Sequence, residues 1–190
     1  FENAKKNVIN VADGIIKSVG KWDNAIGKLD PKKCVFRIYR DVRFSKDKSP
    51  YKTNMGCWFS GGDKNLTMAG YYFHLEPNNS FIGGGIWQPA APQLKAIRQE
   101  IDYNFADFKK IVEGAVFKKN FGKMEGSQLK TIPKGYDKEN PAIEYLKYND
   151  FLASAKLTDK TITSKDLIKN VAELYKAMAP FNQFLNQAIV

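Results

Sequence analysis

Apolar residues recur at helical spacing near the start of the chain, with lysine, asparagine and aspartate in the remaining positions. The apolar positions are Ala4, Val8, Val11, Ala12, Ile15, Ile16 and Val19. This pattern predicts an amphipathic helix that ends near Gly20. Because its apolar stripe is aliphatic, without aromatic anchors, and its opposite side is only mildly basic, we interpret it as a packing face rather than a membrane-binding face.

A different pattern follows, in which apolar and polar residues alternate as they do in β-strands. Four alternating runs succeed one another, and a fifth comes much later: 34–39, 54–60, 70–76, 80–88 and 151–157. Turn-forming residues separate them, such as Pro77-Asn78-Asn79 between the third and fourth. Consecutive strands joined by short turns predict an antiparallel meander sheet of four to five strands.

Helical spacing returns after Pro92, first in a stripe of Leu94, Ile97 and Ile101 and then in further short segments up to residue 121. A loop is expected from 123 to 140 and a short helix from 141 to 146. The last helix begins near residue 163, and Pro180 is expected to kink or break it. With no repeat or linker, we predict a single α+β domain over residues 1–190, its sheet packed by N-terminal, middle and C-terminal helices.

Three consecutive glycines, residues 83–85, interrupt the fourth alternating run. Glycine inside a strand costs conformational entropy and contributes no side chain, so something must approach this backbone closely. Either a helix or an aromatic ring such as Trp58 packs on the bare surface, or the glycines form the floor of a ligand site. The sequence does not continue as a phosphate-binding loop, because no Lys-Ser/Thr pair and helix follow.

Composition narrows the class of protein without selecting a partner. A chain of 190 residues with 43% hydrophobic residues is long enough for a substantial core. The net charge of +10 permits nucleic acid, anionic metabolites or membrane headgroups as partners. No apolar run approaches the ~20 residues that span a bilayer, so we expect no membrane partner. The two cysteines, Cys34 and Cys57, are too few for a disulfide framework. We read them as reduced thiols in a cytoplasmic protein, with a bridge between neighbouring strands as the less favoured alternative.

The positive charge is concentrated between Arg37 and Lys52, where six cations and two anions give a net charge of +4. This segment passes through a Lys-Ser-Pro turn into the next alternating run, which predicts a hairpin with a cationic tip. The guanidinium fork suits phosphate or carboxylate, so an anion site could be formed by Arg37, Arg40, Arg43 and Lys52, with Asp41 orienting a guanidinium and Tyr51 adding a hydroxyl or a stacking ring. The alternative is a solvated hairpin whose charges pair with nearby acids.

His74 is the only histidine, and period-two alternation places it on the same face as Tyr72 and Glu76. This spacing permits a metal-binding pair or a general base with an orienting carboxylate. A metal would need two or three further ligands without a second histidine, so we predict no metal site. His74 stays a candidate acid or base, and a structural histidine is the alternative.

Five motifs occur in order along the chain: FRIYRDVRFSKDKSPYKT at 36–53, GYYFHLEP at 70–77, GGGIWQP at 83–89, PKGY at 133–136 and LKY at 146–148. With these motifs the chain resembles the bacterial and fungal family called domain of unknown function 2461, over nearly its whole length. The resemblance implies an α+β domain and carries over no catalytic residues. It also implies that a further N-terminal segment with a Trp-Phe motif precedes the first helix in the full protein.

Three functions remain open from the sequence. The first is binding of a small anionic ligand by the arginines and Lys52 against an aromatic wall of Tyr51, Tyr72 or Trp87. The second, less favoured because acidic residues are mixed among the basic ones, is nucleic-acid binding. The third is an enzyme on an anionic substrate with His74 as acid or base. None of the three requires a cofactor.

Overall fold

The computed structural model describes residues 2–40, 43, 46, 48–61 and 68–189. Asp41, one of the predicted binding residues, lies outside this range. The chain groups into two compact units, which are described separately below. The first unit contains 1–61, 71–83 and 156–173, and the second contains 62–70, 84–155 and 174–190. The organisation into one domain remains a prediction.

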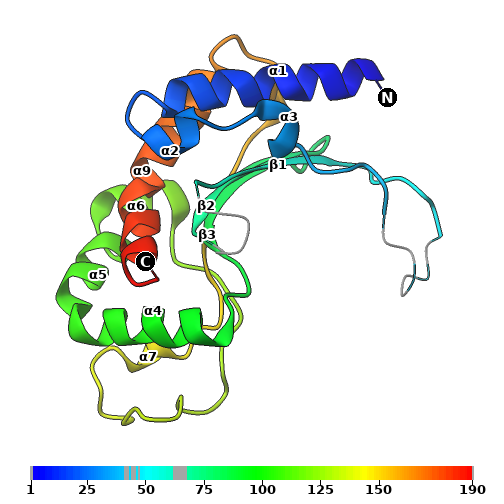
Figure 1. The fold of residues 1–190 in the computed structure, drawn as a ribbon. Helices are drawn as coiled ribbons and strands as arrows, with labels where there is room; N and C mark the ends of the chain where they lie inside the picture. The colour runs from blue at the N-terminus through cyan, green and yellow to red at the C-terminus, as the bar shows by residue number, and fades with distance from the viewer. Residues whose placement is uncertain (1, 41–42, 44–45, 47, 62–67, 190) are drawn as a thin grey trace. The chain divides into compact units, whose positions relative to one another are not determined.

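The fold is α+β, as the sequence predicts, and the strands labelled in Figure 1 follow one another in space as they do in the chain. The described strands are β1 (Met55–Phe59), β2 (Gly70–Leu75), β3 (Phe81–Ile86) and β4 (Phe151–Lys156). They form a four-stranded sheet in the order β1-β2-β3-β4. β1 and β2 pair antiparallel, from Met55 opposite Leu75 to Phe59 opposite Tyr71. This is the predicted meander.

The first alternating run, 34–39, does not form the predicted strand. Pro31–Cys34 is instead the short helix α3, and the side chain of Asp30 caps it by accepting the backbone N–H of Lys32 at 2.9 Å. An aspartate N-cap followed by proline is a strong helix start, and it takes Cys34, the first residue of the run, into α3. Beyond α3 the run makes only isolated bridges, from Val35 to Cys57 and from Tyr39 to Tyr51.

The predicted hairpin is present in its two arms, which we define as residues 36–40 and 49–52. The backbone N–H of Arg40 donates to the carbonyl of Pro50 at 3.0 Å, and the N–H of Lys52 donates to the carbonyl of Ile38 at 2.8 Å. These two bonds flank the Tyr39–Tyr51 bridge. At their base the arms join the sheet, because the N–H of Phe36 donates to the carbonyl of Gly56 in β1 at 2.9 Å.

In the first unit, α1 (Glu2–Val19) buries the face that the sequence predicts and packs against β1. Its buried residues are Val8, Ala12, Ile15, Ile16 and Val19. A side chain at Gly14 would occupy the position of the Ile168 side chain, so this glycine lets residues of the last helix approach α1 closely. Two further short helices, α2 (Asn24–Gly27) and α8 (Asp159–Ile162), begin at the caps Asp23 and Thr158.

The second unit is mainly helical, with α4 (Ala91–Tyr103), α5 (Phe105–Val112), α6 (Ala115–Phe121) and α7 (Ile143–Leu146). The C-terminal part of α9 (Leu167–Gln187) also belongs to it. Helix α9 continues through Pro180 to Gln187, so the helix does not break there, and a kink stays a prediction. Pro180 itself is exposed, whereas its neighbours Ala179 and Phe181 are buried, and this packing offsets the lost backbone hydrogen bond, which costs about 3 kcal/mol.

Helix α9 explains the triple glycine. A Cβ atom added to Gly84 would overlap the Sδ of Met178 in α9 and would lie 2.6 Å from the carbonyl oxygen of Gly70. Gly85 has a φ of +108°, and a side chain there would collide with the backbone of Phe151 in β4. The packing interpretation is therefore confirmed, with a helix rather than Trp58 on the bare backbone.

The described part of the chain contains no helix that is both long and apolar enough to cross a membrane.

Candidate functional site

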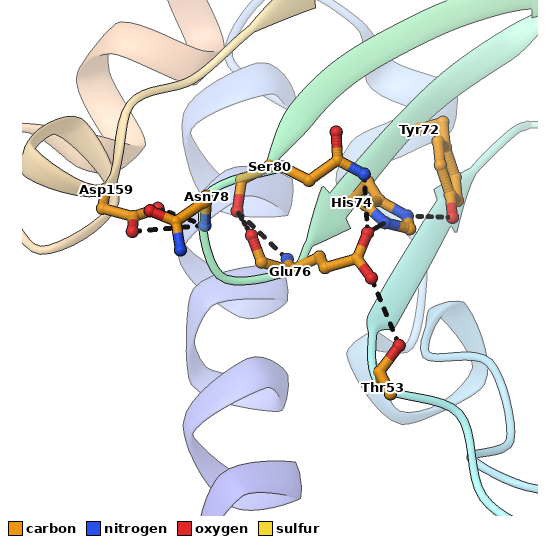
Figure 2. Close-up of polar contacts among 8 residues, drawn as sticks. Thr53, Tyr72, His74, Glu76, Asn78, Ser80 and Asp159 are labelled. Carbon is orange, nitrogen blue, oxygen red and sulfur yellow. Dashed lines mark hydrogen bonds and ion pairs between the residues drawn. The ribbon is translucent and has the colours of Figure 1, made fainter.

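Two side chains on one face of β2 and a third just beyond its end form a hydrogen-bonded chain (Figure 2). The hydroxyl of Tyr72 lies 2.9 Å from Nδ1 of His74, and Nε2 of His74 lies 3.3 Å from Oε2 of Glu76. An ionised carboxylate can only accept, so in neutral His74 the proton sits on Nε2 and Nδ1 accepts the tyrosine O–H. We call this arrangement the Tyr72–His74–Glu76 chain. It follows from the period-two spacing that the sequence predicts.

The space for this chain comes from a glycine on the neighbouring strand. Gly56 pairs with His74 in the sheet, and a Cβ on Gly56 would lie 2.7 Å from the Tyr72 hydroxyl. His74 is 9% exposed, and its ring stacks on that of Phe81, with centroids 4.6 Å apart and planes at 20°. The imidazole is thus held by an aromatic ring on one side and by hydrogen bonds at both nitrogens.

Glu76 collects hydrogen bonds from two other segments. Its Oε1 accepts from the hydroxyl of Thr53 at 3.2 Å, and its Oε2 accepts from the side-chain amide of Asn79 at 2.7 Å as well as from His74. The bonds from Asn79 and His74 favour the carboxylate and lower the pKa of Glu76 below its ordinary value. Glu76 is therefore ionised at neutral pH.

The turn after β2 is fixed by its own hydrogen bonds. The hydroxyl of Ser80 accepts from the backbone N–H of Glu76 at 3.1 Å and donates to its carbonyl at 2.8 Å. Asn78 has a φ of 59°, and its N–H donates to the carboxylate of Asp159 at the start of α8, at 3.0 Å to Oδ1 (Figure 2). These bonds position Glu76 and Asp159 along one side of a cavity.

This cavity, which we call the Lys52–Glu76 hollow, has a volume of about 450 Å³. It is lined by Ile38, Lys52, Thr53, Asn54, Met55, Leu75, Glu76, Pro77, Ser80, Asp159, Ile162 and Thr163. The lining combines an apolar wall with one cation, Lys52, and two carboxylates, Glu76 and Asp159. Its size is that of a small-molecule site.

The predicted binding residues are distributed between this hollow and the hairpin arms. Lys52 lines the hollow, and its ammonium lies 6.0 Å from the centre of the Phe36 ring. Arg37 and Tyr51 are exposed on the arms, and the guanidinium of Arg40 donates to the hydroxyl of Ser49 at 2.8 Å.

The remaining predicted residues lie apart from the hollow. Arg43 is exposed beyond the first arm, and Trp87, 64% exposed, belongs to the second unit. Asp41 is outside the described residues. Among the residues that the structure describes, no predicted arginine lines the hollow.

Sequence reasoning missed most of the polar residues of the site, among them Thr53, Asn79 and Asp159. Thr53 and Asn79 reach Glu76 only because the loops on either side of β1 and β2 bring them there. Asp159 follows β4, far along the chain. The Asn-Asn turn at 78–79 was the one available signal, since asparagine tolerates positive φ and its side chain bonds locally.

Neither the cysteines nor the described acidic residues form a metal site. Cys34 and Cys57 are free and buried, and burial raises the pKa of Cys34 to about 11 and that of Cys57 to about 12. Both thiols are therefore protonated at neutral pH. Within the described ranges, no three His, Cys, Asp or Glu side chains are grouped so that they could hold a metal ion.

The comparisons with known proteins bear on the whole chain. No curated protein and no solved structure was found to match it. One protein family matches, described as "Conserved hypothetical protein (DUF2461)", and the match covers residues 1–184. The motifs at 36–53 and 70–77, which contribute the hairpin arms, Lys52 and the Tyr72–His74–Glu76 chain, fall inside the matched region. On this match, which spans nearly its full length, the chain belongs to the DUF2461 family.

Proposed function

We propose that the protein binds a small carboxylate-bearing molecule in the Lys52–Glu76 hollow. The observation that carries this proposal is that Lys52 and Glu76 line one cavity of about 450 Å³ together with an apolar wall. The ammonium of Lys52 would pair with the acid group of the ligand, and Ile38, Met55 and Leu75 would contact its apolar body. Glu76 would accept a hydrogen bond from a hydroxyl or amino group of the same ligand.

The charges of the lining favour a singly charged acid over a phosphate. Glu76 and Asp159 bring two negative charges and Lys52 one positive charge. At an effective dielectric constant of about 20, two like charges at about 6 Å repel by roughly 3 kcal/mol, so a dianionic phosphate would meet more repulsion than one lysine offsets. A hydroxy or amino acid carries one anionic group for Lys52 and one donor for a carboxylate.

The geometry favours binding over acid–base catalysis by His74. Both ring nitrogens of His74 already contact protein groups, Tyr72 and Glu76, so neither is presented to a ligand. The pKa of Glu76 is lowered, chiefly by the bond from Asn79, whereas a general base at neutral pH works best with a raised pKa. In this proposal, the Tyr72–His74–Glu76 chain holds the Glu76 carboxylate in one orientation for a ligand donor.

A thermal-shift screen tests the proposal. Hydroxy and amino carboxylates would be compared with phosphate esters and with the neutral amides of the same acids, on the wild type and on Lys52→Met. A ligand at a hundred times its Kd stabilises the folded state by about 2.7 kcal/mol, which moves the Tm by several degrees. We expect this increase for carboxylates in the wild type and in the exposed-lysine control Lys33→Met, and its loss in Lys52→Met. The proposal fails if no carboxylate raises the Tm, or if Lys52→Met responds as the wild type does.

A further inference from the structure

The hairpin arms expose three aromatic rings that the fold does not bury. Phe36 is 50% exposed, Tyr39 58% and Tyr51 55%. Tyr39 and Tyr51 face each other across the arms, with ring centroids 5.5 Å apart and planes tilted by 42°. Exposed aromatic surface of this extent, gathered in one place, marks an interaction site more often than scattered single residues do.

The two tyrosines are held in register by the backbone. The bonds from Arg40 N–H to Pro50 and from Lys52 N–H to Ile38 close the arms on both sides of the Tyr39–Tyr51 bridge. Directly opposite residues on antiparallel strands keep their side chains on the same face. The pair of rings is therefore a preformed surface, and a ligand that stacks on it pays little ordering entropy.

Cationic residues neighbour these rings along the chain. Arg37 is two residues from Tyr39 on the same extended arm, and Arg40 is anchored to Ser49 at 2.8 Å. The exposed residues Arg43, Lys46 and Lys48 continue the cationic stretch between the arms. Guanidinium groups suit phosphate oxygens and also stack on flat rings.

We propose that the hairpin arms bind single-stranded nucleic acid, with bases stacking on Tyr39 and Tyr51 and phosphates contacting the surrounding arginines and lysines. Aromatic rings beside a cationic track are the features by which proteins hold single strands without reading sequence. A duplex would leave the rings unused, because its bases are already stacked. Tyrosine and phenylalanine rings can also enter a membrane interface, so vesicles of anionic lipid are included in the test. This proposal does not rest on ligand binding in the hollow, although the arms include Lys52, which also lines the hollow.

Fluorescence anisotropy with labelled oligothymidylate and oligouridylate of about 16 nucleotides tests the proposal, over a salt range of about 50 to 200 mM. We expect affinity to fall with salt at a log–log slope of about −0.7 per phosphate contacted. The double variant Tyr39→Ala/Tyr51→Ala should bind roughly 25-fold or more weakly, because each stacked base contributes a factor of about five or more and two rings are lost. Tyr39→Phe/Tyr51→Phe should bind as the wild type does. Tyr103→Ala, which removes a tyrosine that is 78% exposed outside the arms, is the matched control.

A second probe separates stacking from charge. Inorganic polyphosphate has a row of negative charges but no bases. It should bind more weakly than the oligonucleotides, and its affinity should not change in the tyrosine double variant. The proposal is overturned if the oligonucleotides do not bind at low salt, or if the double variant binds them unchanged. It is also overturned if duplex DNA or vesicles containing anionic lipid bind more tightly than the single strands. A thermal melt of each variant verifies that it is folded.

Discussion

Asp150 offers the sharpest test of how this structure is held together. It is 7% exposed and lies just before β4. Its Oδ1 accepts the backbone N–H of Gln88 at 2.7 Å, and its Oδ2 accepts both the backbone N–H, at 3.2 Å, and the hydroxyl of Ser127. One carboxylate thus joins the end of β3, the loop after α6 and the start of β4. Replacing it with asparagine keeps the shape and turns one acceptor into a donor.

The size of the expected loss of stability follows from these three hydrogen bonds. A hydrogen bond to a charged group contributes about 1.5 to 3 kcal/mol, and three of them would give roughly 4 to 9 kcal/mol if all were shielded from water. Gln88 and Ser127 are exposed, however, so water replaces part of what is lost. We therefore expect Asp150→Asn to lower the free energy of unfolding by about 2 to 4 kcal/mol. The exposed aspartate variant Asp107→Asn should change it by less than about 0.5 kcal/mol.

The assay is urea unfolding of wild type and variant at a series of pH values. Burial alone would raise the pKa of Asp150, but the bonds from Ser127 and Gln88 outweigh it and lower the pKa below the ordinary value of 3.8. A carboxyl with a lowered pKa in the folded state contributes stability that is present above its unfolded pKa and is lost as pH falls through its folded pKa. The difference in the free energy of unfolding between wild type and Asp150→Asn should be constant near neutral pH and should shrink below about pH 4. A difference that is absent at neutral pH, or that does not change in acid, would refute this reasoning.

Three other predictions concern packing, the His74 site and the thiols. Gly84→Ala should lower the free energy of unfolding by about 1 to 3 kcal/mol in urea titrations, because its new Cβ would lie 2.6 Å from the rigid carbonyl oxygen of Gly70. An unchanged urea midpoint would contradict the close packing against Gly84. Tyr72→Phe should lower the free energy of unfolding by about 1 kcal/mol, since it removes the O–H that donates to Nδ1 of His74, and a stabilised variant would contradict this hydrogen bond. Cys57, with a pKa raised to about 12, should react with a thiol reagent only when urea unfolds the chain; rapid labelling of the native protein at neutral pH would contradict its burial.

Local sequence patterns predicted the four strands of the sheet but not the structure of residues 34–39, which lead into it. β1, β2, β3 and β4 all lie within predicted runs, because alternation and turn residues are encoded locally. The run at 34–39 alternates equally well, yet the Asp30–Pro31 helix start takes Cys34 into α3. At Pro180, tertiary packing of the flanking residues decided against a break, and no local pattern reports that packing.

The candidate site was predictable where it depends on one strand and unpredictable where it depends on loops. The face shared by Tyr72, His74 and Glu76 follows from period-two geometry. The hollow does not, because α8 supplies Asp159 and Ile162 from a distant part of the chain. A cluster of arginines in the sequence also does not reveal which cation lines a cavity. Here the cation that lines the hollow is Lys52.

Adjacent residues of one arm serve different surfaces: Tyr51 belongs to the exposed ring pair, whereas Lys52 lines the hollow. A carboxylate bound in the hollow would neutralise Lys52, a cation that a nucleic acid bound to the arms would also contact. The two ligands would then antagonise each other, and thermodynamic reciprocity requires the penalty to be equal in both directions. A nucleic acid on the arms would consequently lower the affinity of the hollow for its small acid, which makes crosstalk between the two surfaces measurable with either ligand as the reporter.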